Sequence, residues 1–215
     1  MSLFTITLPL YTVRHNEVLK CIHKSLCLAY NFSLDKRIKR HNVEKAIRNT
    51  YADITTDTKV ITERPVSENR PDLAVKDHRR KIIYIVDVAI SHKNGIIPKE
   101  REKIAKYETV RRELSQRTGY KALVLPYVVS WDGNVSNENW KVRKILGISK
   151  QVHAYIQQVV MRQIVDIVCR GSSGQIEPLD TWLPEEKVTR ILTTLQEEYP
   201  EEEEHTADLQ SSFTQ

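Results

Sequence analysis

One stretch of the chain combines strong strand-forming character with a carboxylate near its centre. Residues 81–90 read KIIYIVDVAI, so aliphatic and aromatic side chains surround Asp87. This composition indicates a buried strand. An ionised carboxylate in such a strand is costly unless a cation, a metal ion or several hydrogen bonds compensate it. Asp87 is therefore the first residue whose partners the fold must supply.

A second aspartate, Asp72, is expected at the start of the neighbouring strand. Pro71 precedes it and fixes how the chain enters a short strand over residues 73–76. Asp87 lies near the carboxyl end of its own strand, where open α/β sheets place functional groups. Two carboxylates from neighbouring strands can converge on a divalent cation, and oxygen ligands suit Mg²⁺ or Mn²⁺. Taken alone, Pro71-Asp72 fits a simple turn better.

A lysine beside these carboxylates would complete a hydrolytic site, because it can orient the attacking water or stabilise charge that develops on phosphate. Ala89, two residues after Asp87, leaves room for such a group but does not supply it. Lys103 and Lys106 are three apart on the next predicted helix and so share a face. We expect one of the two to reach the site, although such lysines also occur on solvated helix faces.

The remaining elements follow from periodicity and from turn residues. Their order is α-β-β-β-α-β followed by two more helices, which predicts an α/β domain with a mixed central sheet. The predicted helices cover residues 16–30, 98–117, 138–146 and 149–169, and the predicted strands cover residues 55–63, 73–76, 81–90 and 121–130.

The C-terminal part is expected to lie outside the main domain, which we place at residues 11–170. The sequence Gly171-Ser172-Ser173-Gly174 is typical of a helix stop, so residues 171–183 are predicted to be a linker. Residues 184–199 are predicted to form one more helix. A run of glutamates follows, and residues 200–215 are predicted to be a disordered acidic tail.

Charge is divided unevenly between the two parts of the chain. Residues 1–150 hold 29 Lys and Arg against 16 Asp and Glu, whereas residues 151–215 hold 4 against 12. A basic body of this kind suits a partner that carries phosphates. Candidate phosphate contacts are Arg14, His15, Arg70, Arg79, Arg80, Arg111 and Arg112. For Arg14 and His15, support of the core is an equal alternative.

Cysteine content and hydropathy indicate an intracellular protein that does not enter a membrane. The chain has an odd number of cysteines, Cys21, Cys27 and Cys169, which argues against a disulfide framework. Buried thiols are favoured over a metal site that would combine Cys21 and Cys27 with His15 and His23. No apolar run approaches the roughly 20 residues that span a bilayer, and the first residues do not resemble a signal peptide.

The spacing of these motifs resembles that of the PD-(D/E)XK nuclease superfamily, with Ala89 where that family usually has lysine. A closer resemblance is to the restriction-like endonuclease domain at the C-terminal end of site-specific non-LTR retrotransposon reverse transcriptase polyproteins. It covers roughly residues 11–170. The matching segments, in the expected order, are RHNEV (14–18), RPDLAV (70–75), IVDVAI (85–90), KEREKIAKYETVRREL (99–114) and VLPYVVSWDG (124–133).

The resemblance implies a Mg²⁺-dependent or Mn²⁺-dependent endodeoxyribonuclease that nicks target DNA for retrotransposon integration, and hence a nuclear protein. Asp72 and Asp87, with the backbone carbonyl of Val88, would hold the metal ion, and Lys103 or Lys106 would replace the missing lysine. The chain has neither a reverse transcriptase domain nor a zinc knuckle before the RHN segment. We expect either a detached domain or the tail of a larger polyprotein that acts together with a reverse transcriptase.

Other interpretations of the same residues stay open. The domain could bind DNA or RNA without cutting it, or it could be a structural α/β domain with no affinity for nucleic acid. Asp87 could be a core residue paired with an arginine such as Arg70. Tyr107 is interpreted as a packing residue.

Overall fold

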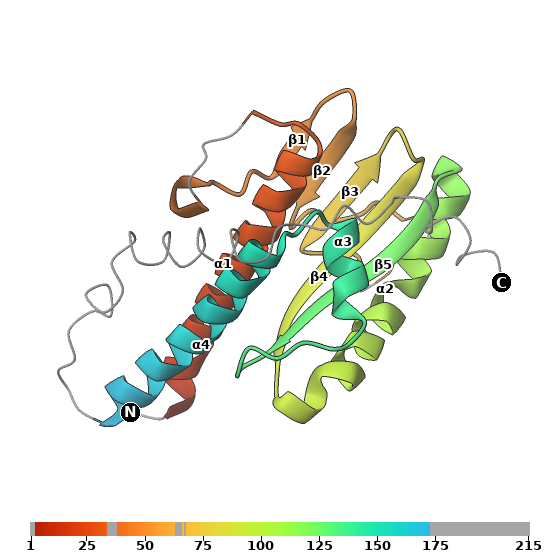
Figure 1. Ribbon diagram of the computed structural model, residues 1–215. Coiled ribbons are helices and arrows are strands. Elements are labelled where there is room, and N and C mark those ends of the chain that lie inside the picture. Colours follow the sequence, from red (N-terminus) through yellow and green to blue (C-terminus); the bar gives the residue numbers. More distant parts are fainter. Residues whose placement is uncertain (1–2, 34–37, 63–65, 67, 173–215) are drawn as a thin grey trace. The chain divides into compact units, whose positions relative to one another are not determined.

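The computed structural model describes residues 3–33, 38–62, 66 and 68–172. Within them the chain forms an α/β fold with one mixed sheet (Figure 1). The predicted C-terminal helix over residues 184–199 and the predicted acidic tail lie outside the described residues, as does the predicted linker beyond Ser172.

The sheet has five strands in the order β1-β2-β3-β4-β5. The first four are antiparallel neighbours, and β5 pairs with β4 in parallel. This mixture requires a crossover between β4 and β5, which a helix supplies. The strands are β1 (Ala46–Arg48), β2 (Ala52–Thr56), β3 (Leu73–Asp77), β4 (Ile82–Ser91) and β5 (Lys121–Ser130).

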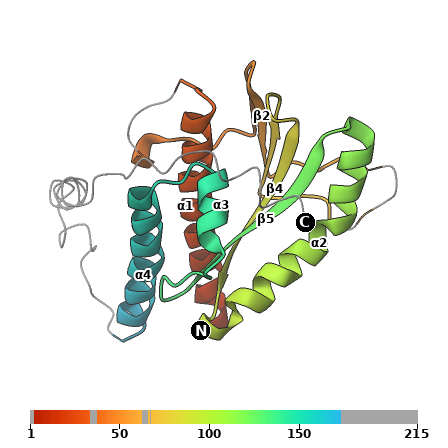
Figure 2. The same cartoon turned by 45° about the vertical axis from the view of Figure 1, so that its right-hand side comes forward.

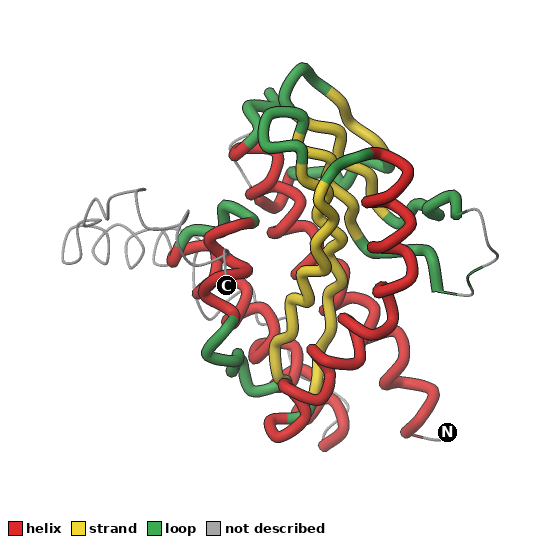
Figure 3. Tube along the Cα trace, turned by 90° about the vertical axis from the view of Figure 1, so that its right-hand side faces the viewer, coloured by secondary structure: helices red, strands yellow, loops and turns green. Residues whose placement is uncertain are grey.

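Helices cover both faces of the sheet (Figures 1 and 2). The crossover helix α2 packs on one face, while α1, α3 and α4 pack on the other. Figure 3 shows the strands running between these two layers. The helices are α1 (Leu3–Ala29), α2 (Ile96–Thr118), α3 (Asn139–Ile145) and α4 (Lys150–Ser172), with short 3₁₀ turns η1 (Ile38–Arg40) and η2 (Lys93–Gly95).

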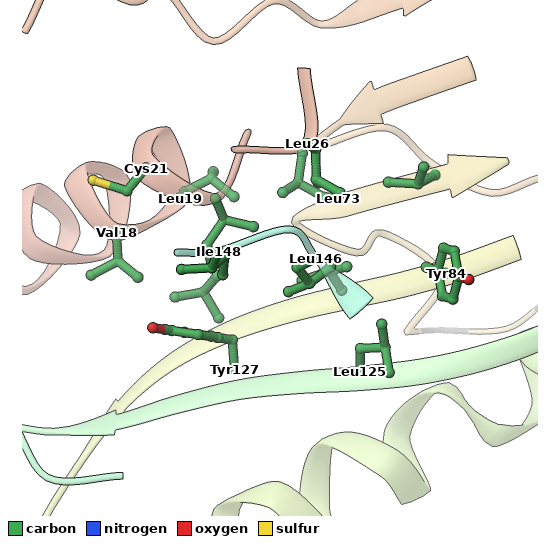
Figure 4. Packing of buried hydrophobic residues seen from close by; sticks show 14 of the residues in the cluster. Val18, Leu19, Cys21, Leu26, Leu73, Tyr84, Leu125, Tyr127, Leu146 and Ile148 are labelled. Carbon is green, nitrogen blue, oxygen red and sulfur yellow. The ribbon is translucent and has the colours of Figure 1, made fainter. Parts of the chain in front are cut away.

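The two faces of β4 are both buried, as its apolar sequence predicts. Tyr84 and Val86 point into the larger core, against α1 and the segments around α3 and α4. Figure 4 shows Tyr84 in this core beside Leu73 and Leu125. Ile83 and Ile85 point the other way, against α2. Each such aliphatic side chain contributes about 1.5–3 kcal/mol when fully buried, so β4 is the central element of the fold.

The structure shortens one predicted strand and adds a strand that was not predicted. The strand expected over residues 55–63 is β2, which ends at Thr56, because Asp57 turns the backbone to a positive φ of 45°. The edge strand β1 was not predicted. It has only three residues and neither end is buried, so no alternating apolar pattern marks it.

Within the described residues, the other predicted elements are confirmed, most of them with shifted ends. Strand β5 occupies the predicted residues, and Pro126 is tolerated there because β5 lies at the edge of the sheet. Helix α1 begins earlier than predicted, at Leu3. Helix α4 continues through Gly171, where a stop was expected, to Ser172.

Candidate functional site

Strand register brings the two predicted carboxylates together. Leu73 on β3 pairs with Val86 on β4. Extending this antiparallel register by one residue puts Asp72 opposite Asp87, and directly opposed residues project from the same face. Ile85, two residues before Asp87, packs against α2, so this is the face that α2 covers. Asp87 is buried and Asp72 is half-buried.

Side chains from α2 compensate the buried charge of Asp87. The hydroxyl of Tyr107 donates a hydrogen bond to Asp87 Oδ1 over 2.6 Å. The ammonium nitrogen of Lys103 lies 2.6 Å from Asp87 Oδ2, and that of Lys106 lies 3.8 Å from Oδ1. Lys103, Lys106 and Tyr107 are three and four residues apart, which places them on one face of the helix. We call these three residues, with Asp72 and Asp87, the carboxylate cluster.

The two oxygens of Asp87 are not equally satisfied. Oδ1 accepts the well-formed bond from Tyr107. Oδ2 is buried and has Lys103 beside it as an ion-pair partner, but it accepts no hydrogen bond of good geometry. A buried carboxylate oxygen normally accepts at least one hydrogen bond, so Oδ2 has capacity left for another ligand.

Tyr107 is a hydrogen-bond donor to the site as well as a core residue. Its hydroxyl also lies 3.0 Å from the backbone carbonyl of Arg70. Burial raises the pKa of Tyr107 above its ordinary value, and the bond to Asp87 and the negative charges of Asp87, Asp72 and Glu68 raise it further. The hydroxyl therefore stays protonated and acts only as a donor.

Hydrogen bonds from the backbone of β4 and from a side chain of α1 hold the Asp72 carboxylate. Its Oδ2 accepts hydrogen bonds from the Val88 backbone N–H over 2.7 Å and from His15 Nε2 over 3.0 Å. Because β3 begins only at Leu73, it has no residue to pair with Val88, and the Asp72 side chain takes that place. The N–H and C=O of one strand residue point to the same side, so the Val88 carbonyl also faces Asp72. Asp72 Oδ1 takes part in neither bond.

His15 is linked electrostatically to both aspartates. Burial alone would lower its pKa, but the hydrogen bond and charge of Asp72 outweigh burial, with smaller contributions from Asn16 and Asp87. The net effect raises the pKa of His15, which favours an imidazolium beside Asp72. His15 thus supplies a positive charge from the helix layer on the opposite face of the sheet.

One acidic residue near the cluster was not predicted. Glu68 Oε2 lies 3.1 Å from the ammonium nitrogen of Lys106, whose side chain also lies over the ring of Tyr107. Glu68 is exposed, in the loop before β3. No sequence pattern distinguishes it from other loop acids. Its position leaves Lys106 shared between two carboxylates, whereas Lys103 is closer to Asp87.

Arg70 is not the partner of Asp87. Its guanidinium binds Asp57, with Nε 2.7 Å from Oδ1 and Nη2 2.7 Å from Oδ2. Both side chains are exposed. The alternative that Asp87 pairs with this arginine is therefore wrong, because lysines and a tyrosine from α2 occupy that role.

Two of the predicted phosphate contacts lie far from the carboxylate cluster. Arg79 and Arg80 lie in the turn between β3 and β4, and the stretch of β4 from Ile82 to Asp87 alone spans roughly 17 Å. Asp77 shapes this turn by accepting hydrogen bonds from the backbone N–H of both arginines and from the Arg80 guanidinium. These arginines form a separate basic surface.

The remaining predicted phosphate contacts are nearer to the site. Arg111 and Arg112 follow Tyr107 by about one helical turn, and both bind Glu108, whose pKa their hydrogen bonds lower to about 2. That pairing reduces the positive charge they offer to a partner. Arg14 is half-buried on α1, next to His15.

The geometry of the cluster stands without support from known relatives. The chain matches no protein-family model, and no curated protein matches it. Within the described residues, no helix is both long enough and apolar enough to cross a membrane. The chemistry of the carboxylate cluster is therefore the basis for a functional proposal.

Proposed function

We propose that this chain is a metal-dependent DNA endonuclease domain with a restriction-endonuclease-like core. The observation that carries the proposal is the convergence of Asp72, directly before β3, with Asp87 on β4 and Lys103 on α2. Two carboxylates and a lysine at the ends of paired strands form the set that hydrolysis of a phosphodiester requires. The resemblance in the order of motifs assigns the same two aspartates together with Lys103 or Lys106.

The donor set fits a hard divalent cation such as Mg²⁺ or Mn²⁺. Asp72, Asp87 and the Val88 carbonyl would be the ligands, all of them oxygens. The fit rests on Asp87 Oδ2, which accepts no hydrogen bond of good geometry and becomes available when Lys103 moves away from it. It rests also on Asp72 Oδ1, which takes no part in the bonds to Val88 and His15. When bound, such an ion supplies polarisation of the scissile phosphate and a lowered pKa for an attacking water.

The protein's own residues have separable roles. Lys103 moves between its contact with Asp87 and the substrate, where it orients water or balances the charge that develops on phosphate. Tyr107 holds Asp87 in place by donating to Oδ1, and His15 with the Val88 N–H holds Asp72. Lys106 is the supporting lysine, because Glu68 shares it. The exact placement of both carboxylates depends on these hydrogen bonds.

The implied substrate is duplex DNA at a retrotransposon target, nicked before a reverse transcriptase extends the new end. Nuclear localisation belongs to the same proposal. Binding through Lys and Arg side chains is strongly salt-dependent and carries little sequence preference by itself. A separate reverse transcriptase or other targeting domain would supply strand choice.

The test is nicking of supercoiled plasmid by the purified chain at low salt, in Mg²⁺, in Mn²⁺ and in chelator. We expect metal-dependent nicking that the Asp87→Asn variant loses by about 100-fold or more. Asp57→Asn is the matched control, because Asp57 is an exposed aspartate that binds Arg70 outside the cluster. Equal nicking by wild-type and Asp87→Asn proteins, or nicking in chelator, would refute the proposal.

A second candidate is a nucleic-acid-binding module that no longer cuts. The observation in its favour is that Lys103 and Tyr107 compensate part of the charge of Asp87 without any metal ion. Such a module binds DNA or RNA equally well in Mg²⁺ and in chelator, and it produces no nicks. The plasmid assay, combined with a binding measurement in both buffers, separates the two functions.

A further inference from the structure

A second buried group of titratable side chains lies away from the carboxylate cluster. His23 and Cys27 are on α1, and His41 follows η1 directly. All three are buried, and their candidate ligand atoms lie within 4.8 Å of one another. We call them the histidine–cysteine cluster. None of them has a part in the proposed cleavage reaction.

The contacts inside this cluster are close and incomplete. His23 Nδ1 lies 2.7 Å from His41 Nε2, and Cys27 Sγ lies 3.5 Å from the same His23 nitrogen. The two facing ring nitrogens can share only one proton. The other nitrogen of His23, Nε2, is buried and has no hydrogen-bond partner. When the ring proton of neutral His23 is on Nε2, Nδ1 has a lone pair that faces His41 and Cys27.

Burial, and then His41, lower the pKa of His23 to about 4. Burial, followed by the charges of Lys24 and Lys20, also lowers the pKa of His41. Burial thus favours the neutral form of both rings in the metal-free protein.

We propose that His23, Cys27 and His41 bind a Zn²⁺ ion, with a water molecule as the fourth ligand. Zinc lies about 2.0–2.1 Å from histidine nitrogen and about 2.3 Å from thiolate sulfur. In a tetrahedron these bonds separate two nitrogens by about 3.4 Å and a nitrogen from a sulfur by about 3.6 Å. The separation of Cys27 Sγ from His23 Nδ1 already fits. The His41 ring has to move about 0.7 Å away from His23 Nδ1 and to within about 3.6 Å of Cys27 Sγ, and all three ligand atoms now lie within 4.8 Å of one another.

The ligand types select zinc over the cation proposed for the carboxylate cluster. Mixed nitrogen and sulfur ligands suit Zn²⁺, whereas Mg²⁺ prefers oxygen. His23 and Cys27 are four residues apart on one helix, so α1 presents them on the same face. Cys21, the other buried thiol on α1, is not part of this group. His15 binds Asp72. The candidate site therefore differs from the one considered from the sequence, which combined Cys21 and Cys27 with His15 and His23.

Zinc binding would release a proton from Cys27 and would change the charge of the site. As a free thiol, Cys27 has its pKa raised to about 12 by burial and by the charge of Glu44, so it is protonated. Zinc displaces that proton, because only the thiolate is a ligand. One thiolate leaves the site with a net positive charge, which Glu44 offsets and Lys24 and Lys20 oppose. The bound ion ties the segment after η1 to α1.

The test uses the full chain, stripped with chelator and then titrated with Zn²⁺ and Co²⁺. We expect about one Zn²⁺ per chain by elemental analysis and, with Co²⁺, a thiolate-to-metal charge-transfer band. Cys27→Ser should lose the band and His41→Gln should lose bound zinc, while the matched control Cys21→Ser keeps both.

A folded wild-type chain that retains no zinc and shows no charge-transfer band would overturn the proposal, whatever the folding of the variants. An unchanged band in Cys27→Ser would overturn it as well. Neither result depends on DNA cleavage, so failure of this proposal is distinguishable from failure of the endonuclease proposal.

Discussion

The carboxylate cluster and the histidine–cysteine cluster lie on opposite faces of one sheet, and the cost of burying polar groups is offset differently in each. The carboxylate cluster keeps its charges and balances them with lysines from α2. The histidine–cysteine cluster keeps its members neutral and leaves His23 Nε2 without a partner. The comparison teaches that ligand chemistry separates the two proposals, because oxygen ligands suit a hard cation whereas nitrogen and sulfur ligands suit zinc.

Replacing Lys103 breaks the charge balance of the first cluster and should have the largest effect on stability. Lys103→Met leaves the buried Asp87 carboxylate without its nearest cation, which costs about 3–5 kcal/mol when a buried pair loses one partner. Urea denaturation measures the change in the free energy of unfolding. A loss below about 1 kcal/mol would mean that Asp87 does not depend on this pair.

Replacing Tyr107 tests the hydrogen bond that orients Asp87. Tyr107→Phe should lower the free energy of unfolding by about 1.5–3 kcal/mol, because the acceptor is charged. The matched control is Tyr127→Phe, which removes a buried bond of 2.8 Å to neutral His153 and should cost about 0.5–1.5 kcal/mol. Equal losses in the two variants would contradict a charged Asp87.

The contact between His15 and Asp72 makes stability depend on pH. The folded-state pKa of His15 is raised above 6.5, so its stabilising contribution is fully present below pH 6.5 and is lost as pH rises through the folded pKa. At pH 5.5 the free energy of unfolding of wild-type protein should exceed that of His15→Gln by about 1 kcal/mol or less. This difference should shrink by pH 8.5.

Comparing wild-type protein with His15→Gln cancels the opposite effect that other histidines have on stability, because both proteins contain them. The lowered pKa values of His23 and His153 make stability fall as pH drops below 6.5 in both proteins. A difference between the two proteins that stays constant from pH 5.5 to pH 8.5 would show that His15 does not gain a proton beside Asp72.

Lys106→Met should have the smallest effect on the free energy of unfolding. It tests whether Lys103 and Lys106 have different roles. Lys106 is 3.8 Å from Asp87, and its closer partner, Glu68, is exposed. Ion pairs of this kind contribute about 0–1 kcal/mol, so the free energy of unfolding should fall by no more than that. A loss as large as that of Lys103→Met would mean that the lysines share the role.

The sequence predicted those parts of the site that depend on local periodicity. Alternation along β4 and spacing along α2 were enough to place Asp87, Lys103 and Lys106 on facing surfaces. Tyr107 was interpreted as a packing residue, because its position on α2 predicts burial but not the carboxylate at its hydroxyl. The turn that ends β2 at Asp57 was missed, because a positive φ at a non-glycine residue has no clear sequence signal.

Contacts between distant segments could not be predicted. His15 reaches Asp72 because α1 packs across the sheet where β3 has not yet begun, and such packing is a tertiary property. His41 joins His23 and Cys27 for the same kind of reason, since the segment after η1 folds back on α1. In both cases the partners are brought together by the core and not by spacing along the chain.

The measurement that tests the central claim most directly is nicking of supercoiled plasmid in Mg²⁺ by Asp72→Asn protein. The asparagine oxygen can still accept the hydrogen bonds from Val88 and His15, so the fold should persist while the negative charge is removed. The account predicts nicking by wild-type protein and a loss of about 100-fold or more in the variant. Nicking at the wild-type rate by folded Asp72→Asn protein would contradict it.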